Sequence, residues 1–309
     1  MTKHINFLGK RQFAAIFSGL LLITAIASLA TQGLKLGIDF TGGTLVELGY
    51  NKPVDLDVMR GVLTEKGFAD ATVQHFGSAQ EILLRLKPQE GLSNAQLSVE
   101  ISAAADSVMN AQGDMRRVEF VGPQVGDELT EDGGLALLYS MFGILIYVAW
   151  RFEYKFALGS VAALAHDVLI TLGFFSVLQL EFDLTVLAAI LAVIGYSLND
   201  TIVVYDRIRE NFRLLRKGSA ENIMNISLNQ TLSRTLMTSV TTLLVLVALA
   251  FLGGEIIHNF SIALLVGVVI GTYSSIYVAS PLVLALGVSK EDLMETEVEK
   301  EGADFDMMP

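Results

Sequence analysis

Six apolar stretches, each long enough to cross a bilayer as a helix, restrict this chain to a polytopic membrane fold. A hydrocarbon core of about 30 Å needs roughly 20 helical residues, and backbone polar groups inside it must be bonded within the protein. The stretches occupy residues 13–31, 135–150, 156–178, 184–204, 233–252 and 260–286. The chain is 52% hydrophobic and only 17% charged, which agrees with a membrane protein.

The first stretch has two interpretations. Lys10 and Arg11 precede it, and the residues Ala25-Ile26-Ala27 resemble the cleavage site of a secretory signal peptide. The apolar run of about 18 residues, however, is longer than a typical signal core. This length favours an uncleaved membrane anchor.

Lys and Arg residues predict the orientation of the spans. They precede the first span and recur in the turn at 151–155 and the loop at 205–217. The alternate turns, at 179–183 and 253–259, carry none. Because positively charged loops remain in the cytoplasm, both termini are expected there, and the long segment after the first span is expected outside.

These spans divide the chain into four predicted parts. They are the N-terminus with the first span (1–32), an external domain (33–134), a five-helix membrane bundle (135–287) and an acidic tail that is expected to be disordered (288–309). The net charge of −12 argues against nucleic acid as a partner. The chain has no cysteine, which excludes disulfides and thiolate metal sites.

The external segment has the hydrophobic periodicity of a small α+β domain. Between residues 36 and 122, strand and helix patterns follow one another in the order βαββαβ, which predicts a ferredoxin-like fold. Gly42-Gly43 lies between strand-like residues and lacks the lysine of a phosphate loop, so a turn or bulge is the better interpretation. His75 has no companion residues and is expected to be a surface or structural histidine.

Two charged residues of opposite sign lie inside the apolar stretches. Asp200 lies roughly 24 Å from the outer edge of the fourth span, and Arg234 roughly 28 Å from the outer end of the fifth, at 1.5 Å per residue. Charges inside a membrane are costly unless they are paired, hydrated or neutralised. A neutralising pair or a proton-dependent site is therefore expected, although Arg234 could also extend to the interface.

The third span carries a second polar pair, His166-Asp167, near the predicted midplane. Either a structural hydrogen bond between helices or a proton relay would account for it. Small or polar residues also recur at a spacing of four in four spans, a pattern typical of helices packed inside a bundle. These stripes are Gly159, Ala163, Asp167 and Thr171; Ala188, Ala192, Tyr196 and Asp200; Arg234, Thr238 and Thr242; and Gly267, Gly271, Ser275 and Ala279.

Four segments resemble the SecF family of protein-export membrane proteins. They are GIDFTGGT after the first span, AHDVLIT in the third, IGYSLNDTIVVYDRIREN in the fourth and SRTLMTSVTT in the fifth. The likeness covers nearly the whole chain. It implies a six-span half of an RND-like transporter in the bacterial inner membrane, with SecD supplying the other half. The SecYEG channel and YajC are then expected partners, together with lipid and the translocating polypeptide.

The resemblance also implies a mechanism. The protein would be a transport accessory without enzymatic activity or cofactor, using the proton motive force for a late stage of polypeptide translocation. By motif match, Asp200 and Arg234 would belong to the proton-transfer site. His166, Asp167, Asn199 and Thr201 would serve either a secondary relay or helix packing. Because the chain stops after six spans, a separate SecF rather than a fused SecD–SecF is expected.

Two other functions fit parts of this pattern. One is a half-subunit of an RND-type small-molecule efflux transporter, although such pumps usually have two large external loops and this chain has one. The other is a purely structural subunit, in which every ionisable residue of the spans would tolerate neutral substitution. No Walker loop, HExxH or GxSxG motif occurs in the sequence.

Overall fold

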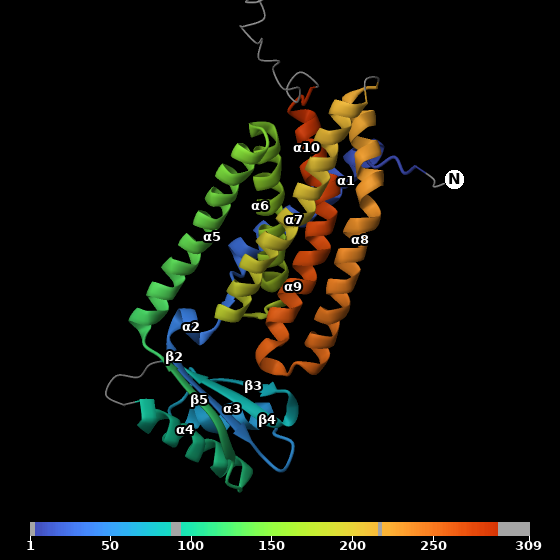
Figure 1. Cartoon of the computed structure of the whole chain (residues 1–309). Coiled ribbons are helices and arrows are strands. Elements are labelled where there is room, and N and C mark those ends of the chain that lie inside the picture. Colours follow the sequence, from blue (N-terminus) through green and yellow to red (C-terminus); the bar gives the residue numbers. More distant parts are fainter. Residues whose placement is uncertain (1–3, 88–93, 216–217, 290–309) are drawn as a thin grey trace, which may run out of the picture.

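The structure is a computed structural model that describes residues 4–87, 94–215 and 218–289. It consists of a bundle of long helices with a small α/β domain at one end (Figure 1). Within these ranges, six helical segments are long and apolar enough to cross a membrane, as the sequence predicted. They are α1 (Arg11–Thr31), α5 (Pro123–Arg151), α6 (Tyr154–Leu178), α7 (Leu184–Leu214), α8 (Ala220–Leu252) and the continuous segment formed by α9 (Glu255–Ser274), a π-helical turn (Ser275–Ala279) and α10 (Ser280–Ala285).

Several helices extend beyond the predicted spans. α5 already begins at Pro123, a residue suited to the first helical turn. It packs so closely on residues 40–42, far earlier in the chain, that a Cβ at Gly126 would lie 2.9 Å from the carbonyl oxygen of Phe40. The predicted domain boundary at residue 134 therefore lies inside a helix. These residues, assigned from the sequence to the external domain, form the first turns of a membrane helix instead.

Most of the basic segment 205–217, predicted as a loop, belongs to α7, which forms a helical hairpin with α8. α7 continues to Leu214, and the Ser219 hydroxyl accepts a hydrogen bond from the backbone of Asn222 to cap α8. Arg207 donates to the side-chain oxygen of Gln230 across the hairpin at 2.6 Å. The hairpin therefore continues beyond the predicted ends of both spans.

The α/β domain is built on a four-stranded antiparallel sheet. Its elements are β2 (Gly43–Gly49), α3 (Leu56–Glu65), β3 (Thr72–Phe76), β4 (Ser78–Leu86), α4 (Asn94–Met109) and β5 (Asp114–Val121). The strand order β3-β4-β2-β5 is that of the ferredoxin-like fold predicted from the sequence. α3 and α4 cover one face of the sheet, where Val46, Leu84 and Ile101 are fully buried in a shared core.

The segment before β2 differs from the predicted strand. Residues Ile38–Thr41 form a short helix, α2, and Gly42 and Gly43 follow with φ angles of 67° and 131°. A Cβ at Gly43 would overlap the carbonyl oxygen of Leu86. The two glycines therefore turn the chain into the sheet, which supports a turn rather than a phosphate loop.

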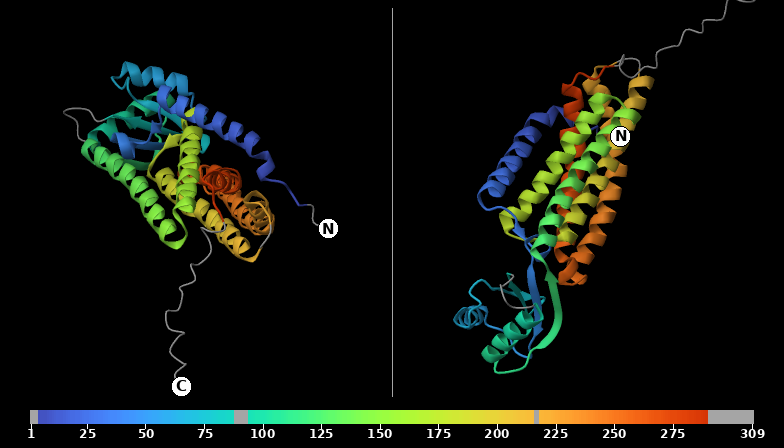
Figure 2. Two further views of the ribbon diagram at one scale, coloured as in Figure 1. Left: turned by 90° about the horizontal axis from the view of Figure 1, so that it is seen from above. Right: turned by 90° about the vertical axis from the view of Figure 1, so that its left-hand side faces the viewer.

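The α/β domain is attached to the membrane helices by backbone pairing. β1 (Lys35–Leu36) pairs in parallel with β6 (Glu181–Phe182), which lies in the turn between α6 and α7. The backbone N–H of Leu184, the first residue of α7, donates to the Asp39 carboxylate at 2.9 Å. Figure 2 shows the domain projecting from this end of the bundle.

A partly buried ion pair reinforces the same attachment. Arg85 of β4 pairs with Glu181 of β6, and both side chains are largely shielded from solvent. Burial lowers the pKa of Arg85, while the carboxylates of Asp183 and Asp39 act in the opposite direction. Asn259 of α9 donates to the carbonyl oxygen of Glu181 at 3.1 Å. The sheet is thereby connected to the first turns of both α7 and α9.

The predicted acidic tail lies almost wholly outside the described residues. The structure is described as far as residue 289, so only the first two residues of the segment 288–309 fall within it. The prediction that this segment is disordered therefore stays a prediction.

Candidate functional site

Helices α6, α7 and α9 meet through faces of small residues. A Cβ at Gly267 of α9 would overlap Val193 of α7, and one at Gly271 would lie 3.0 Å from the Cβ of Ser197. All members of the stripes predicted for the third and sixth spans are buried. These two stripes are therefore packing faces, as predicted, and they bring polar side chains of three helices together.

Asp167 lies at this junction and is saturated with hydrogen bonds. Its side chain is fully buried. One carboxylate oxygen accepts from Ser197 of α7 at 2.6 Å and from Ser274 of α9 at 2.7 Å. The other lies 2.9 Å from Nδ1 of His166. Asp167 thus connects three membrane helices through its side chain.

The other nitrogen of His166 extends this network to α1. Nε2 lies 3.1 Å from the Ser18 hydroxyl, and Ser18 lies 3.0 Å from the hydroxyl of Tyr273. The Tyr273 ring also stacks on the imidazole, with centroids 6.3 Å apart. The pair predicted in the third span is therefore a link between α1, α6, α7 and α9.

Asp200 has very different surroundings, although it is only 2% exposed. Its Oδ2 atom has no hydrogen-bond partner among the described residues. The Ser239 hydroxyl and the Arg234 guanidinium are its polar neighbours on α8. An unsatisfied oxygen in a buried carboxylate is costly. Binding of a proton or a water molecule at Oδ2 would remove this cost.

Arg234 does not form the expected ion pair with Asp200 in the described part of the chain. Its side chain lies on the exposed face of α8, whereas Asp200 points into the bundle. The two charges still interact electrostatically, which agrees with the similar depths derived from the sequence. The structure therefore supports matched depth but not direct pairing.

The buried polar stripe of α8 is displaced by one position from the prediction. The buried residues at a spacing of four are Ser227, Thr231, Thr235 and Ser239, whereas Thr238 and Thr242 are only partly buried. Depth and periodicity could not decide which of two adjacent polar faces pointed inward. Both faces carry several hydroxyl residues, and Arg234 lies on the face that points outward.

The same stripe gives Asp200 a neighbour that the sequence did not reveal. Tyr196 of α7 donates to Ser239 of α8 at 3.4 Å. The two helices are antiparallel. Asp200 lies one turn after Tyr196 on α7, and Thr235 lies one turn before Ser239 on α8, so Asp200 and Thr235 lie at the same level. The Thr235 hydroxyl oxygen is also buried without a partner. Two unpartnered oxygens thus lie at one level of the α7–α8 interface.

The hydroxyl of Ser239 belongs to a network with α9. It donates to the carbonyl of Thr235 at 2.9 Å and lies 2.6 Å from the hydroxyl of Thr272. Thr272 in turn donates to the carbonyl of Val268 at 2.8 Å. The neighbour of Asp200 is therefore bonded to its own helix and to α9, which fixes the polar wall beside the carboxylate.

The remaining predicted residues flank Asp200 on opposite sides of α7. Thr201 is buried, whereas Asn199 is exposed. Ala188 and Ala192, which were expected inside, are exposed as well. The fourth-span stripe is therefore only partly a packing face within this chain.

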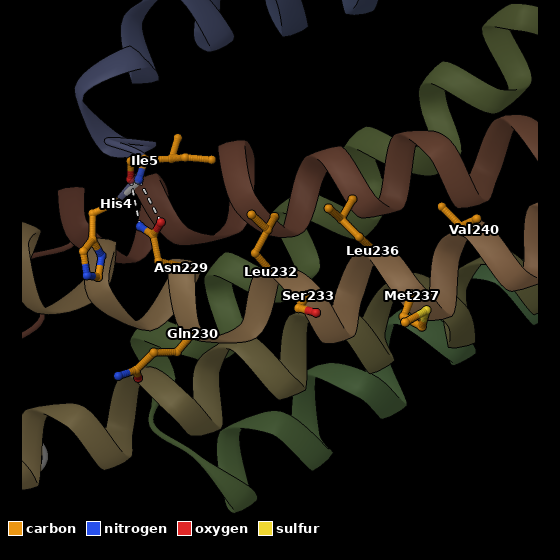
Figure 3. Close-up of a pocket in the computed structure, with 9 residues that line it drawn as sticks. All are labelled: His4, Ile5, Asn229, Gln230, Leu232, Ser233, Leu236, Met237 and Val240. Atoms are coloured by element: carbon orange, nitrogen blue, oxygen red, sulfur yellow. Dashed lines mark hydrogen bonds between the residues drawn. The ribbon is translucent and has the colours of Figure 1, made fainter. Parts of the chain in front are cut away.

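A groove lies elsewhere, on the outer surface of α8 (Figure 3). It has a volume of about 730 Å³ and is lined mainly by Leu236, Met237 and Val240, with His4 and Ile5 at one end. The Asn229 side chain exchanges two 2.8 Å hydrogen bonds with the backbone of Ile5. Among the residues described, no cluster of His, Asp or Glu is arranged to bind a metal ion.

Family models match most of this chain. The SecD/SecF C-terminal model of protein export membrane proteins covers residues 101–289, which include Asp167, Asp200 and Arg234. The SecD/SecF GG motif covers residues 27–54, which include Gly42-Gly43.

Alignments with similar proteins cover nearly the full length of this chain. Protein translocase subunit SecF of Vibrio alginolyticus is 56% identical over 307 residues, covering 99% of this chain and 98% of the relative. The SecF subunit of Escherichia coli O157:H7 is 48% identical over 303 residues, covering 98% and 94%. A crystal structure of SecDF, a translocon-associated membrane protein from Thermus thermophilus, is 41% identical with a TM-score of 0.84, and the alignment covers 92% of this chain and 39% of that one. The chain therefore belongs to the SecF family of protein translocase subunits.

Proposed function

We propose that this protein, together with a SecD-type partner in the bacterial inner membrane, uses the proton gradient to promote a late stage of polypeptide translocation. The observation that carries this proposal is the buried Asp200 carboxylate, whose Oδ2 has no hydrogen-bond partner. A proton neutralises such a group without requiring any rearrangement of existing bonds. Asp167, by contrast, is already engaged in several bonds and suits a structural position.

Arg234 would respond to the charge of Asp200. With the carboxylate ionised, the guanidinium is attracted toward it; with the carboxylate protonated, that attraction disappears. Thr235, level with Asp200, offers a second oxygen to a water molecule between the helices. One proton moving through 100 mV releases about 2.3 kcal/mol, enough to shift a two-state equilibrium by roughly fifty-fold.

A partner half would cover the exposed side of this site. The small or short residues Ala188, Ala192, Gly195 and Asn199 form an exposed stripe on α7, here called the α7 stripe. A Cβ at Gly195 would meet no atom within 4 Å, so none of the described residues packs there. This chain spans only 39% of the related SecDF chain. A second six-span half packed against the α7 stripe would bury both it and Arg234.

Proton binding at Asp200 would reach the α/β domain through α7. This helix begins at Leu184, where the backbone is bonded to Asp39 of the domain. A shift of α7 would therefore displace the surface on the far side of the membrane that we expect to meet the emerging polypeptide. The SecYEG channel and YajC would be further partners, with both termini of this chain in the cytoplasm.

Replacement of Asp200 tests the proposal. Asp200→Asn should leave the protein folded and assembled, because Oδ2 has no bond to lose, but should abolish the gradient-dependent part of secretion in inverted membrane vesicles. Thr201→Ser, at the adjacent position, is the matched control and should keep that stimulation. Normal stimulation by assembled Asp200→Asn protein would exclude Asp200 as the proton carrier. Co-purification with an outer-membrane channel instead of SecD would point to efflux.

A further inference from the structure

The hydrogen-bond chain from α9 to His166 determines where its protons lie. Tyr273 donates to the carbonyl oxygen of Ala14 at 2.9 Å, and a carbonyl can only accept. This uses the single hydroxyl proton of Tyr273, so Ser18 must donate in their 3.0 Å contact. Ser18 then has no proton left for His166, 3.1 Å away. The Nε2 atom of the ring must therefore carry a proton.

The opposite side of the ring then needs a second proton. Nδ1 of His166 lies 2.9 Å from Oδ1 of Asp167. A hydrogen bond forms there if an imidazolium faces a carboxylate, or if a neutral ring accepts from a protonated carboxyl group. Without that proton, two lone pairs would face each other. In either bonded arrangement the two side chains carry no net charge, which suits their nearly complete burial.

We propose that His166 and Asp167 together bind one proton and that this proton maintains the link between Ser18 and Tyr273. After its loss, the stable arrangement is a neutral ring donating from Nδ1 to the carboxylate. Nε2 then accepts from Ser18, and the only proton of Ser18 is withdrawn from Tyr273. A connection between α1 and α9 is lost. This proton-binding site is distinct from Asp200 and does not depend on the proposed function.

A groove on the surface of the bundle reaches one member of this pair. It has a volume of about 570 Å³, lies between α1, α6 and α10, and reaches His166. Arg11, at the start of α1, lines the groove and is paired with Glu221 of α8 at 2.8 Å. Tyr277 also lines the groove, and its ring contacts that of Tyr273, with centroids 5.3 Å apart.

Nitrogen magnetic resonance on the full-length chain tests the proposal. The chain, labelled with ¹⁵N at its four histidines, is purified with its partner subunits and placed in lipid bilayers. His166→Gln assigns the signal of interest. His258 is an internal standard, because its Nδ1 lies 2.9 Å from the carbonyl oxygen of Ala250 and must donate there.

At neutral pH we expect His166 to be protonated at Nε2. In addition, either Nδ1 is protonated too, or a carboxylic C=O infrared band is present that disappears in Asp167→Asn. A neutral His166 ring protonated only at Nδ1, with no such band, would overturn the proposal.

Substitutions of Ser18 test the link to Tyr273 separately. Ser18→Ala removes the oxygen that accepts the hydrogen bond from Nε2–H of His166. A fraction of rings protonated only at Nδ1 should therefore appear. Ser18→Thr keeps the hydroxyl and should retain the native signal. Ser28→Ala is the matched control on the same helix, since Ser28 contacts Ser176 at 2.7 Å and not His166. An unchanged signal in folded Ser18→Ala protein would show that Ser18 does not determine the protonation of the ring.

Discussion

Asp167 and Asp200 are almost equally buried, yet replacing each with alanine should have very different effects on stability. Asp167 is fully buried and Asp200 is 2% exposed. The Asp167 side chain contacts His166, Ser197 and Ser274 at 2.9, 2.6 and 2.7 Å. Oδ2 of Asp200 has no partner. The comparison therefore separates the contribution of bonding from that of burial.

The structure gives the size of the difference. Hydrogen bonds between helices of membrane proteins contribute about 0.6 kcal/mol on average and up to about 1.7 kcal/mol. Three such bonds make Asp167→Ala destabilising by about 2 kcal/mol, with an upper limit of about 5 kcal/mol. Asp200→Ala should cost less than about 1 kcal/mol, because Oδ2 has no bond to lose and the contact with the Ser239 hydroxyl counts as one average bond at most.

Unfolding of the purified chain in bicelles by steric trapping measures both free energies on one scale. Asp167→Asn is a useful third variant, since an amide can donate to Nδ1 of His166 while its oxygen accepts from the serines. It should retain most of the stability that alanine loses. If Asp200→Ala destabilises the protein as much as Asp167→Ala, the conclusion that the Asp167 side chain holds the helices together while the Asp200 side chain does not is refuted.

Two further predictions concern packing and domain attachment. Gly267→Leu should prevent stable folding, because its side chain would overlap Val193, whereas Gly195→Leu should leave the chain folded but weaken co-purification with its partner; equal yields of folded protein would contradict this. Glu181→Arg should increase hydrogen exchange at β1 and β6 by breaking the ion pair with Arg85, and adding Arg85→Glu should restore protection. Failure of the double variant to recover would show that the ion pair does not hold the domain.

Hydrophobic length and periodicity were sufficient to predict the six spans and the order of the α/β elements. They were not sufficient to place the helix ends. The segment from Pro123 to residue 134 is charged and contains two adjacent glycines, which locally favours a loop. The close contact between Gly126 and Phe40 holds it in a helix. Such a contact between distant segments has no local sequence signal.

The candidate site was only partly predictable for a similar reason. Asp200 and Asp167 stand out in the sequence because charge is rare in apolar spans. Thr235 does not, since hydroxyl residues occur on every side of α8. Which face turns inward depends on neighbouring helices, so the exposed position of Arg234 could not be derived from spacing alone. The sequence signal for the buried face of α8 was the row of hydroxyl residues at a spacing of four from Ser227 to Ser239.

The pairing of β1 with β6 also constrains the order of events during synthesis. Lys35 pairs with Glu181, and the whole α/β domain and two membrane helices lie between them in the chain. The domain has its own core and can fold as soon as β5 is complete. Its attachment must wait until the ribosome has added the turn after α6. A nascent chain arrested before residue 181 would therefore carry a folded but unattached domain, and this interval is when a chaperone or protease would find it most accessible.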